Sequence, residues 1–278
     1  MELVWHTFVH AVKISFFVFL MMILIDYLNV ETHGRLRELI RGRKWRQYSV
    51  SSFLAATPGC LGAFMDVSLY VHGLISFGAL TGAMVATSGD EAFVMIAMFP
   101  VKALLLFTGL FILGIILSWV TDILKNLIHL STCESCNLQK FHPKEKNLRH
   151  YLTVHIWKHI FKKHIIRVFL WTFGALLIVN LGLSYWNLEL FVRQNVVWMG
   201  VLAVLVGIIP ESGPNLIFIT LYAKGLIPIS VLIANSIVQD GHGLLPMLSY
   251  SVKDSIQLKL FNMTYGVLIG GAIYLLGH

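Results

Sequence analysis

A seven-residue stretch occurs twice in the sequence and decides how the chain is organised: Leu69-Tyr70-Val71-His72-Gly73-Leu74-Ile75 and Leu221-Tyr222-Ala223-Lys224-Gly225-Leu226-Ile227. The offset is 152 positions, and five of the seven residues are identical. With the same offset and no gaps, Pro58 falls on Pro210 and Gly89 falls on Gly241. An apolar composition alone would match Leu with Leu, but it would not bring Pro, Tyr and Gly into register. We therefore expect two related halves.

The composition is that of a membrane protein. Of 278 residues, 57% are hydrophobic and 13% are charged, whereas soluble domains carry about 25% charged residues. The mean hydropathy is +0.76. Apolar stretches recur that are long enough to cross about 30 Å of hydrocarbon. The first, 4–30, has neither the basic start nor the small-residue cleavage site of a signal peptide. These features predict an all-α polytopic membrane protein.

The repeat extends to the helices that flank each half. The stretch 4–30 maps onto 156–182, close to the apolar run 165–186, and 101–124 maps onto 253–276. Each half therefore has a first flanking helix, a middle stretch and a second flanking helix. We expect one repeat at 1–124, a linker at 125–164 and a second repeat at 165–278.

The basic residues predict that the halves have opposite topology. Six of the 21 Lys and Arg residues lie in 35–46 and nine lie in 125–167. Such clusters mark cytoplasmic segments, and topology rather than nucleic-acid binding explains the net charge of +7. The first flanking helix then runs inward and its mate outward. Lys253 and Lys259 mark the inner end of the last helix. Both chain termini are expected outside and the linker inside, an arrangement of inverted repeats that many secondary transporters share.

The middle stretch of each half is interrupted twice by Pro, Gly and polar residues. The interruptions are Thr57-Pro58-Gly59-Cys60, Thr87-Ser88-Gly89-Asp90-Glu91, Pro210-Glu211-Ser212-Gly213-Pro214 and Gln239-Asp240-Gly241-His242-Gly243. Proline and glycine break helices, and irregular backbone at membrane depth must line protein or water. We expect broken or re-entrant helices there, whose ends face a ligand.

Acidic residues concentrate at the same breaks. A charge inside the bilayer costs about 2.5–3.5 kcal/mol, so several carboxylates together indicate a bound cation. Oxygen donors suit manganese, and imidazole suits zinc or iron. The candidate substrate ligands are Asp90, Glu91, Asp240, His242, Gln239, Asn235, Glu211 and Ser88. A softer site, made of Cys60 and nearby methionines, is the alternative.

Three ionisable residues share one face of the first flanking helix: His6, His10 and Lys13. Their spacings of four and three residues place them on that face. We expect a proton relay or counter-ion there, with Asp66 as a further member. The alternative is that both histidines lie at the outer membrane surface.

The linker carries the remaining cysteines. Cys133 and Cys136, followed by His142, form half of a zinc-site pattern. We expect cytoplasmic metal capture, with an idle reduced pair as the alternative, and no disulfide.

The sequence 69–100 and the sequence 210–246 resemble the ten-transmembrane heavy-metal exporter family, whose members are labelled arsenic efflux proteins or manganese transporters. The likeness covers nearly the whole chain. It implies a bacterial inner-membrane efflux protein with five membrane segments in each half. It also implies site roles for the residues in the matching motifs: Ser88, Gly89, Asp90, Glu91, Gln239, Asp240, Gly241 and His242.

The sequence therefore predicts a secondary transporter that exports a divalent metal ion, manganese first and iron or zinc next, by proton antiport. No Walker A motif is present. We expect no catalytic residue, no permanently bound cofactor and, beyond the ion and the bilayer, no partner except a second copy of the chain in a homodimer. One alternative is a transporter of an organic substrate or of an oxyanion such as arsenite. Another is a membrane-embedded lipid-pyrophosphate phosphatase, although no arginine lies at the breaks to bind phosphate.

Overall fold

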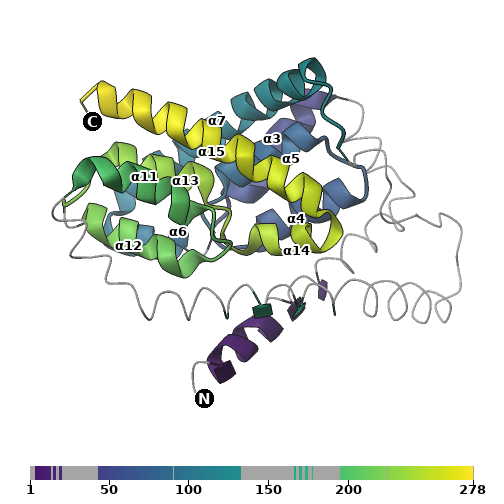
Figure 1. The fold of residues 1–278 in the computed structure, drawn as a ribbon, viewed down its shortest axis with the longest axis horizontal. Coiled ribbons are helices and arrows are strands. Elements are labelled where there is room, and N and C mark those ends of the chain that lie inside the picture. Colours follow the sequence, from purple (N-terminus) through teal and green to yellow (C-terminus); the bar gives the residue numbers. More distant parts are fainter. Residues whose placement is uncertain are drawn as a thin grey trace, which may run out of the picture.

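A computed structural model describes residues 4–13, 15–16, 19–20, 43–89, 91–132, 166, 169–170, 173–174, 177, 195–223 and 225–277. These residues form helices and turns, with no strand among them (Figure 1). Much of the predicted helices 4–30 and 165–186, and most of the linker 125–164, lies outside the described residues. So do four predicted site residues: Asp90, Cys133, Cys136 and His142.

The described helices of the first half recur in the second half. The first half contains α3 (Lys44–Ala56), α4 (Leu61–Val71), α5 (Phe77–Ala86), α6 (Glu91–Met98) and α7 (Pro100–Leu127). The second half contains α11 (Val196–Gly207), α12 (Ser212–Ala223), α13 (Ile229–Val238), the 3-10 turn η3 (Gly241–Gly243), α14 (Leu244–Tyr250) and α15 (Val252–Leu275). The bounds of α5 and α13 differ by 152 positions at both ends, as do the starts of α7 and α15.

Glycines that follow equivalent helices adopt equivalent backbone conformations. The φ angles of Gly73 and Gly225 are 69° and 68°, and those of Gly89 and Gly241 are both 51°. L-residues rarely adopt these angles. The chain therefore turns in the same way at the same register in both halves.

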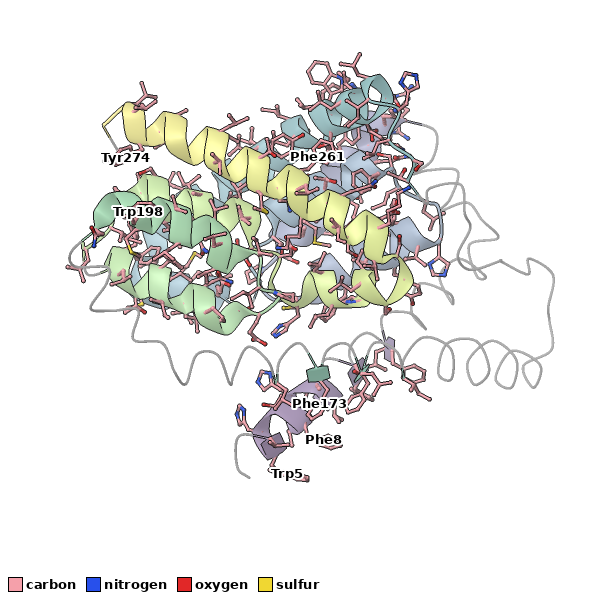
Figure 2. The ribbon with its side chains drawn as sticks, in the orientation of Figure 1. Trp5, Phe8, Phe173, Trp198, Phe261 and Tyr274 are labelled. Carbon is pink, nitrogen blue, oxygen red and sulfur yellow. The ribbon has the colours of Figure 1, made fainter. Side chains whose placement is uncertain are left out.

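Two described helices, α7 and α15, are long and apolar enough to cross a membrane. With 28 and 24 residues, they measure about 42 Å and 36 Å at 1.5 Å per residue. Only 39% and 33% of their most apolar windows are buried. Their outward faces expose large apolar side chains, among them Leu105, Ile112, Leu260 and Leu268. Tyr274 of α15 and Trp198 of α11 are also exposed (Figure 2). Lipid explains this exposure better than water does.

Short helices fill the interior. All ten residues of α5 are buried, yet ten residues span only about 15 Å. Ser76 caps its first turn by accepting a hydrogen bond from the Ala79 amide at 3.1 Å. Close packing of α5 on α7 depends on Gly82, where a Cβ would overlap Ser118 Oγ and the Gly114 carbonyl. Helix α13 packs on α15 in the same way, with Gly266 and Gly270 against Val238 and Ala234.

The two halves interlock rather than sit side by side. Helix α4 of the first half packs on α14 of the second, and α12 of the second packs on α6 of the first (Figure 1). Hydrogen bonds between side chains join the halves; for example, Tyr70 Oη donates to Asp254 Oδ2 at 2.6 Å, and the hydroxyls of Thr121 and Tyr265 lie 2.8 Å apart. Buried polar contacts of this kind fix the relative position of the halves.

Candidate functional site

The loops that follow α5 and α13 meet at the centre of the molecule. A Cβ at Gly89 would lie 3.6 Å from the Gly241 Cα, and a Cβ at Gly241 would lie 3.6 Å from the Gly89 Cα. Gln239 donates from Nε2 to the Thr87 carbonyl at 3.1 Å, and these two residues are 152 positions apart. Residues at the same register therefore touch each other here.

Two helices also begin at this point. Cys60 is the N-cap of α4, and Ser212, its counterpart at the offset of 152, is the first residue of α12. A Cβ at Gly241 would lie 3.3 Å from Ser212 Oγ and 3.7 Å from Cys60 Sγ. The Ser212 hydroxyl is buried and has no hydrogen-bond partner among the described residues. Polar donors from both halves thus surround the glycine contact.

His242 connects three of the polar side chains at the centre. Its Nδ1 lies 3.4 Å from Cys60 Sγ, and its Nε2 lies 3.0 Å from Glu211 Oε1. Cys60 is a free, buried thiol, and the imidazole is 2% exposed. Since an ionised carboxylate only accepts hydrogen bonds, Nε2 carries the proton that bonds to Glu211. In a neutral imidazole this leaves the Nδ1 lone pair directed at the thiol.

The N-terminal helix brings a second histidine to this site. The His10 ring centroid lies 6.3 Å from that of His242, and His6 stacks on His10 at 5.4 Å. His6, His10 and Lys13 are themselves exposed, while Thr7, Ala11 and Ser15 form the buried face of the helix. Phe8 lies edge-on to Phe173 (Figure 2). The predicted histidine pair therefore lies on the exposed face of the N-terminal helix, and His10 of this pair lies next to His242.

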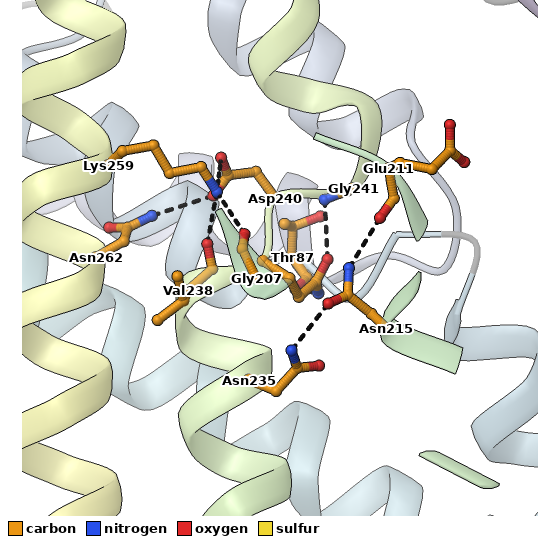
Figure 3. Close-up of polar contacts among 11 residues, drawn as sticks. Thr87, Gly207, Glu211, Asn215, Asn235, Val238, Asp240, Gly241, Lys259 and Asn262 are labelled. Carbon is orange, nitrogen blue, oxygen red and sulfur yellow. Dashed lines mark hydrogen bonds and ion pairs between the residues drawn. The ribbon is translucent and has the colours of Figure 1, made fainter. Parts of the chain in front are cut away.

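Asp240 has a different partner. Its Oδ2 lies 2.7 Å from Lys259 Nζ, and its Oδ1 accepts from Asn262 Nδ2 at 3.2 Å (Figure 3). Lys259 is 6% exposed and lies in α15. Our use of Lys259 as a marker of the inner membrane surface was therefore wrong, because the side chain is buried in the core of the protein.

The predicted amide ligands are held by other protein groups. Asn235 Nδ2 donates to Asn215 Oδ1 at 2.8 Å (Figure 3). It also donates to the Ala203 carbonyl at 2.9 Å. Asn215 in turn donates to the Glu211 carbonyl at 2.9 Å. Gln239 Oε1 accepts from the Gly241 amide at 2.8 Å. These amides support the loops that carry Glu211 and His242.

The remaining predicted residues are buried in the first half. Ser88 follows α5, and Glu91 begins α6. Asp66 is fully buried in α4 beside Ser51 of α3. Within the described ranges, which omit Asp90, no group of three or more His, Cys, Asp or Glu side chains is arranged to hold a metal ion.

Sequence reasoning missed three features of the site. It did not pair Cys60 with His242, it did not single out Ser212, and it did not place Lys259 inside the protein. A partial signal existed for Lys259, since Lys259 and Asn262 are three positions apart and share one face of α15, although the sequence does not give the residues that this face contacts. For Ser212 the signal was the offset of 152 positions between the halves, because this offset aligns Ser212 with Cys60.

Comparison with known proteins identifies the chain's family. The family described as "Putative, 10TM heavy-metal exporter" matches residues 4–177 and 167–277. No curated protein and no solved structure is significantly similar to the chain. The match covers almost the entire sequence. The chain is a multi-pass membrane protein and belongs to the ten-transmembrane heavy-metal exporter family.

Proposed function

We propose that the chain is a secondary transporter that exports a divalent transition-metal ion, and that Cys60 and His242 are its first ligands. The observation that carries this proposal is the distance of 3.4 Å between Cys60 Sγ and His242 Nδ1. A tetrahedral zinc ion bound to one sulfur and one imidazole nitrogen separates those atoms by about 3.5 Å. The two side chains can therefore take up an ion with little movement.

Glu211 orients His242 rather than binding the ion itself. Metal-bound histidines usually donate their other ring N–H to a carboxylate, which fixes the tautomer and raises the basicity of the ligand nitrogen. The contact between His242 Nε2 and Glu211 Oε1 is of this kind. Ser212 Oγ adds a neutral oxygen beside the pair, and Asp90, which aligns with His242 in the repeat, is our candidate for the third strong ligand. Asp240 has no ligand role in this proposal, since Lys259 and Asn262 occupy it.

The proposed ligand atoms, a thiol sulfur and an imidazole nitrogen, indicate which ion the site prefers. Oxygen ligands alone would favour manganese, our first expectation from the sequence. A thiol beside an imidazole shifts the preference towards zinc or iron. We therefore place zinc first and keep manganese as the comparison.

The transport cycle would use the two opposed halves and a proton path. In inverted-repeat transporters the substrate lies where the halves meet, and access alternates around it. The contact of Gly89 with Gly241 is such a meeting point. His10 and His6 extend from His242 towards the exposed side of the N-terminal helix, and histidines exchange protons near neutral pH. Proton antiport would then drive export.

Ion flux in proteoliposomes tests the proposal. The purified protein is assayed with zinc, manganese, iron and arsenite, and compared with Cys60→Ser and His242→Gln. We expect flux of a divalent ion that both substitutions abolish. His129→Gln, which replaces an exposed histidine just after the end of α7, should leave the flux unchanged. Flux that persists in both site variants would overturn the ligand assignment. The absence of flux for every divalent ion would overturn the function.

One observation favours a second candidate substrate. The N-termini of α4 and α12 both end at Cys60 and Ser212, and helix N-termini favour anions. Arsenite binds sulfur, and an oxyanion could accept hydrogen bonds from these ends. Transport of arsenite without transport of zinc or manganese would favour this reading.

A further inference from the structure

Lys259 occupies a pocket whose walls are oxygen atoms. Its Nζ donates to the Gly207 carbonyl at 2.9 Å and to the Val238 carbonyl at 2.7 Å, and it lies 2.7 Å from Asp240 Oδ2 (Figure 3). An ammonium group has three donors and no acceptor. Two carbonyl oxygens, at the ends of α11 and α13, therefore accept hydrogen bonds from the ammonium group, and the carboxylate of Asp240 pairs with its charge.

The pocket is built for positive charge. Gly207 is the last residue of α11 and Val238 is the last residue of α13. The C-terminus of a helix carries partial negative charge and unpaired carbonyl groups. The carboxylate of Asp240 adds a full charge in a position where its side chain is completely buried. Without a cation in the pocket, these buried oxygens would have no hydrogen-bond or charge partner, and the folded state would lose stability.

Among the described residues, the first half has no counterpart to this pocket. At the offset of 152, Lys259 aligns with Phe107, Asp240 with Ser88 and Asn262 with Leu110. Phe107 and Leu110 are buried in an apolar cluster. The charged pocket is thus a special feature of one half and not a requirement of the shared fold.

We infer that this pocket is a binding site for a small monovalent cation, and that the chain fills it with its own ammonium group. Lys259 acts as a tethered cation that holds the C-termini of α11 and α13 together with the loop of Asp240. That loop continues directly into Gly241 and His242. The protein therefore needs no sodium ion at this position, and Lys259 is a positioning residue for the central site. The inference does not depend on which ion is transported.

Chemical rescue of Lys259→Ala tests the inference. Thermal unfolding of the purified full chain is followed in detergent in methylammonium, sodium or tetramethylammonium chloride at equal ionic strength. Loss of one partner of a buried ion pair should lower the Tm of Lys259→Ala by about 10 °C. We expect methylammonium or sodium to restore at least half of that loss. Tetramethylammonium, which is bulky and has no N–H donor, should restore none. Wild type and Lys253→Ala, which removes an exposed lysine at the start of the same helix, should respond to none of these salts.

Two outcomes would overturn the inference. One is a Lys259→Ala protein whose Tm equals that of wild type or is equally raised by all three salts. The other outcome depends on a control for folding. The double variant Lys259→Met with Asp240→Asn removes both charges, and it should fold and show no change in Tm with methylammonium. If the double variant folds but Lys259→Ala cannot be purified even in methylammonium, the pocket does not accept a free cation. Because no arm uses transport, a failure here is distinct from a failure of the proposed function.

Discussion

The imidazole of His242 has different neighbours at its two nitrogens. One faces a thiol at 3.4 Å and the other faces a carboxylate at 3.0 Å. In the proposed site His242 would bind the ion through Nδ1, while the contact of Nε2 with Glu211 sets the tautomer. The roles of Cys60 and Glu211 can therefore be separated by substitution.

Replacing Glu211 should weaken ion binding without abolishing it. Loss of a carboxylate that orients a metal-bound histidine typically costs 10–100-fold in affinity. We expect a zinc dissociation constant about 10–100-fold higher for Glu211→Ala, with partial recovery in Glu211→Gln, which keeps an acceptor oxygen. Titration of the purified protein against a competing zinc chelator measures this. An unchanged constant in Glu211→Ala would show that the carboxylate does not act on the site.

His10 should matter for coupling and not for binding. The centroid of its ring lies 6.3 Å from that of His242, a separation that one bridging water can span. We expect His10→Gln to retain zinc affinity and to lose the stimulation of flux by an imposed pH gradient. Parallel measurements of flux with and without the gradient check this. Equal stimulation in His10→Gln and wild type would contradict a relay through His10.

At the scale of elements, α5 and α13 show what the sequence could predict. The register of 152 and the Gly and Pro breaks locate both helices and the loops that follow them, because these signals are local in the chain. Lys259 shows the limit. In the sequence Lys259 lies near Lys253 and Asp254, so the pattern predicts that all three belong to a helix start at the membrane surface. Its carbonyl partner in Gly207 lies 52 positions away, and only the folded structure brings them together. The pairing of Cys60 with His242, 182 positions apart, was inaccessible for the same reason.

The packing of α5 on α7 gives a prediction at this scale. A Cβ at Gly82 would overlap Ser118 Oγ and the Gly114 carbonyl, whereas a Cβ at Gly109 of α7 meets nothing within 4 Å. Overpacking costs about 1–3 kcal/mol, and alanine in an open helical position gains up to about 1 kcal/mol over glycine. We expect Gly82→Ala to lower the Tm and Gly109→Ala to leave it equal or higher. A Gly82→Ala protein as stable as Gly109→Ala would mean that the two helices are not in close contact.

At the scale of the whole molecule, the orientation of the chain depends on few charges. With Lys259 assigned to the core, Lys253 is the lysine that marks the start of α15, while Lys125 lies in the last turn of α7. We propose that both of these ends face the cytoplasm, so that α7 and α15 cross the membrane in opposite directions.

Reporter fusions in bacteria test this orientation. A fluorescent protein inserted in the linker between 133 and 150 should be bright, because that segment is expected in the cytoplasm. The same reporter placed after residue 278 should be dark, and an exported phosphatase there should be active. The opposite pattern at either site would exclude the inverted arrangement of the halves.

The packing of helices of one half on helices of the other half also constrains biosynthesis. Helix α4 packs on α14, and α12 packs on α6, so α4 and α6 obtain these partners only when the second half has been made. At about 5–20 residues per second, the ribosome needs roughly 6–23 s to produce the second half. During that interval the carboxylate-bearing loops of the first half lie in the membrane without their permanent neighbours. The chain must then be kept from degradation until synthesis is complete, and a truncation after the first half would leave α4 without α14 and α6 without α12.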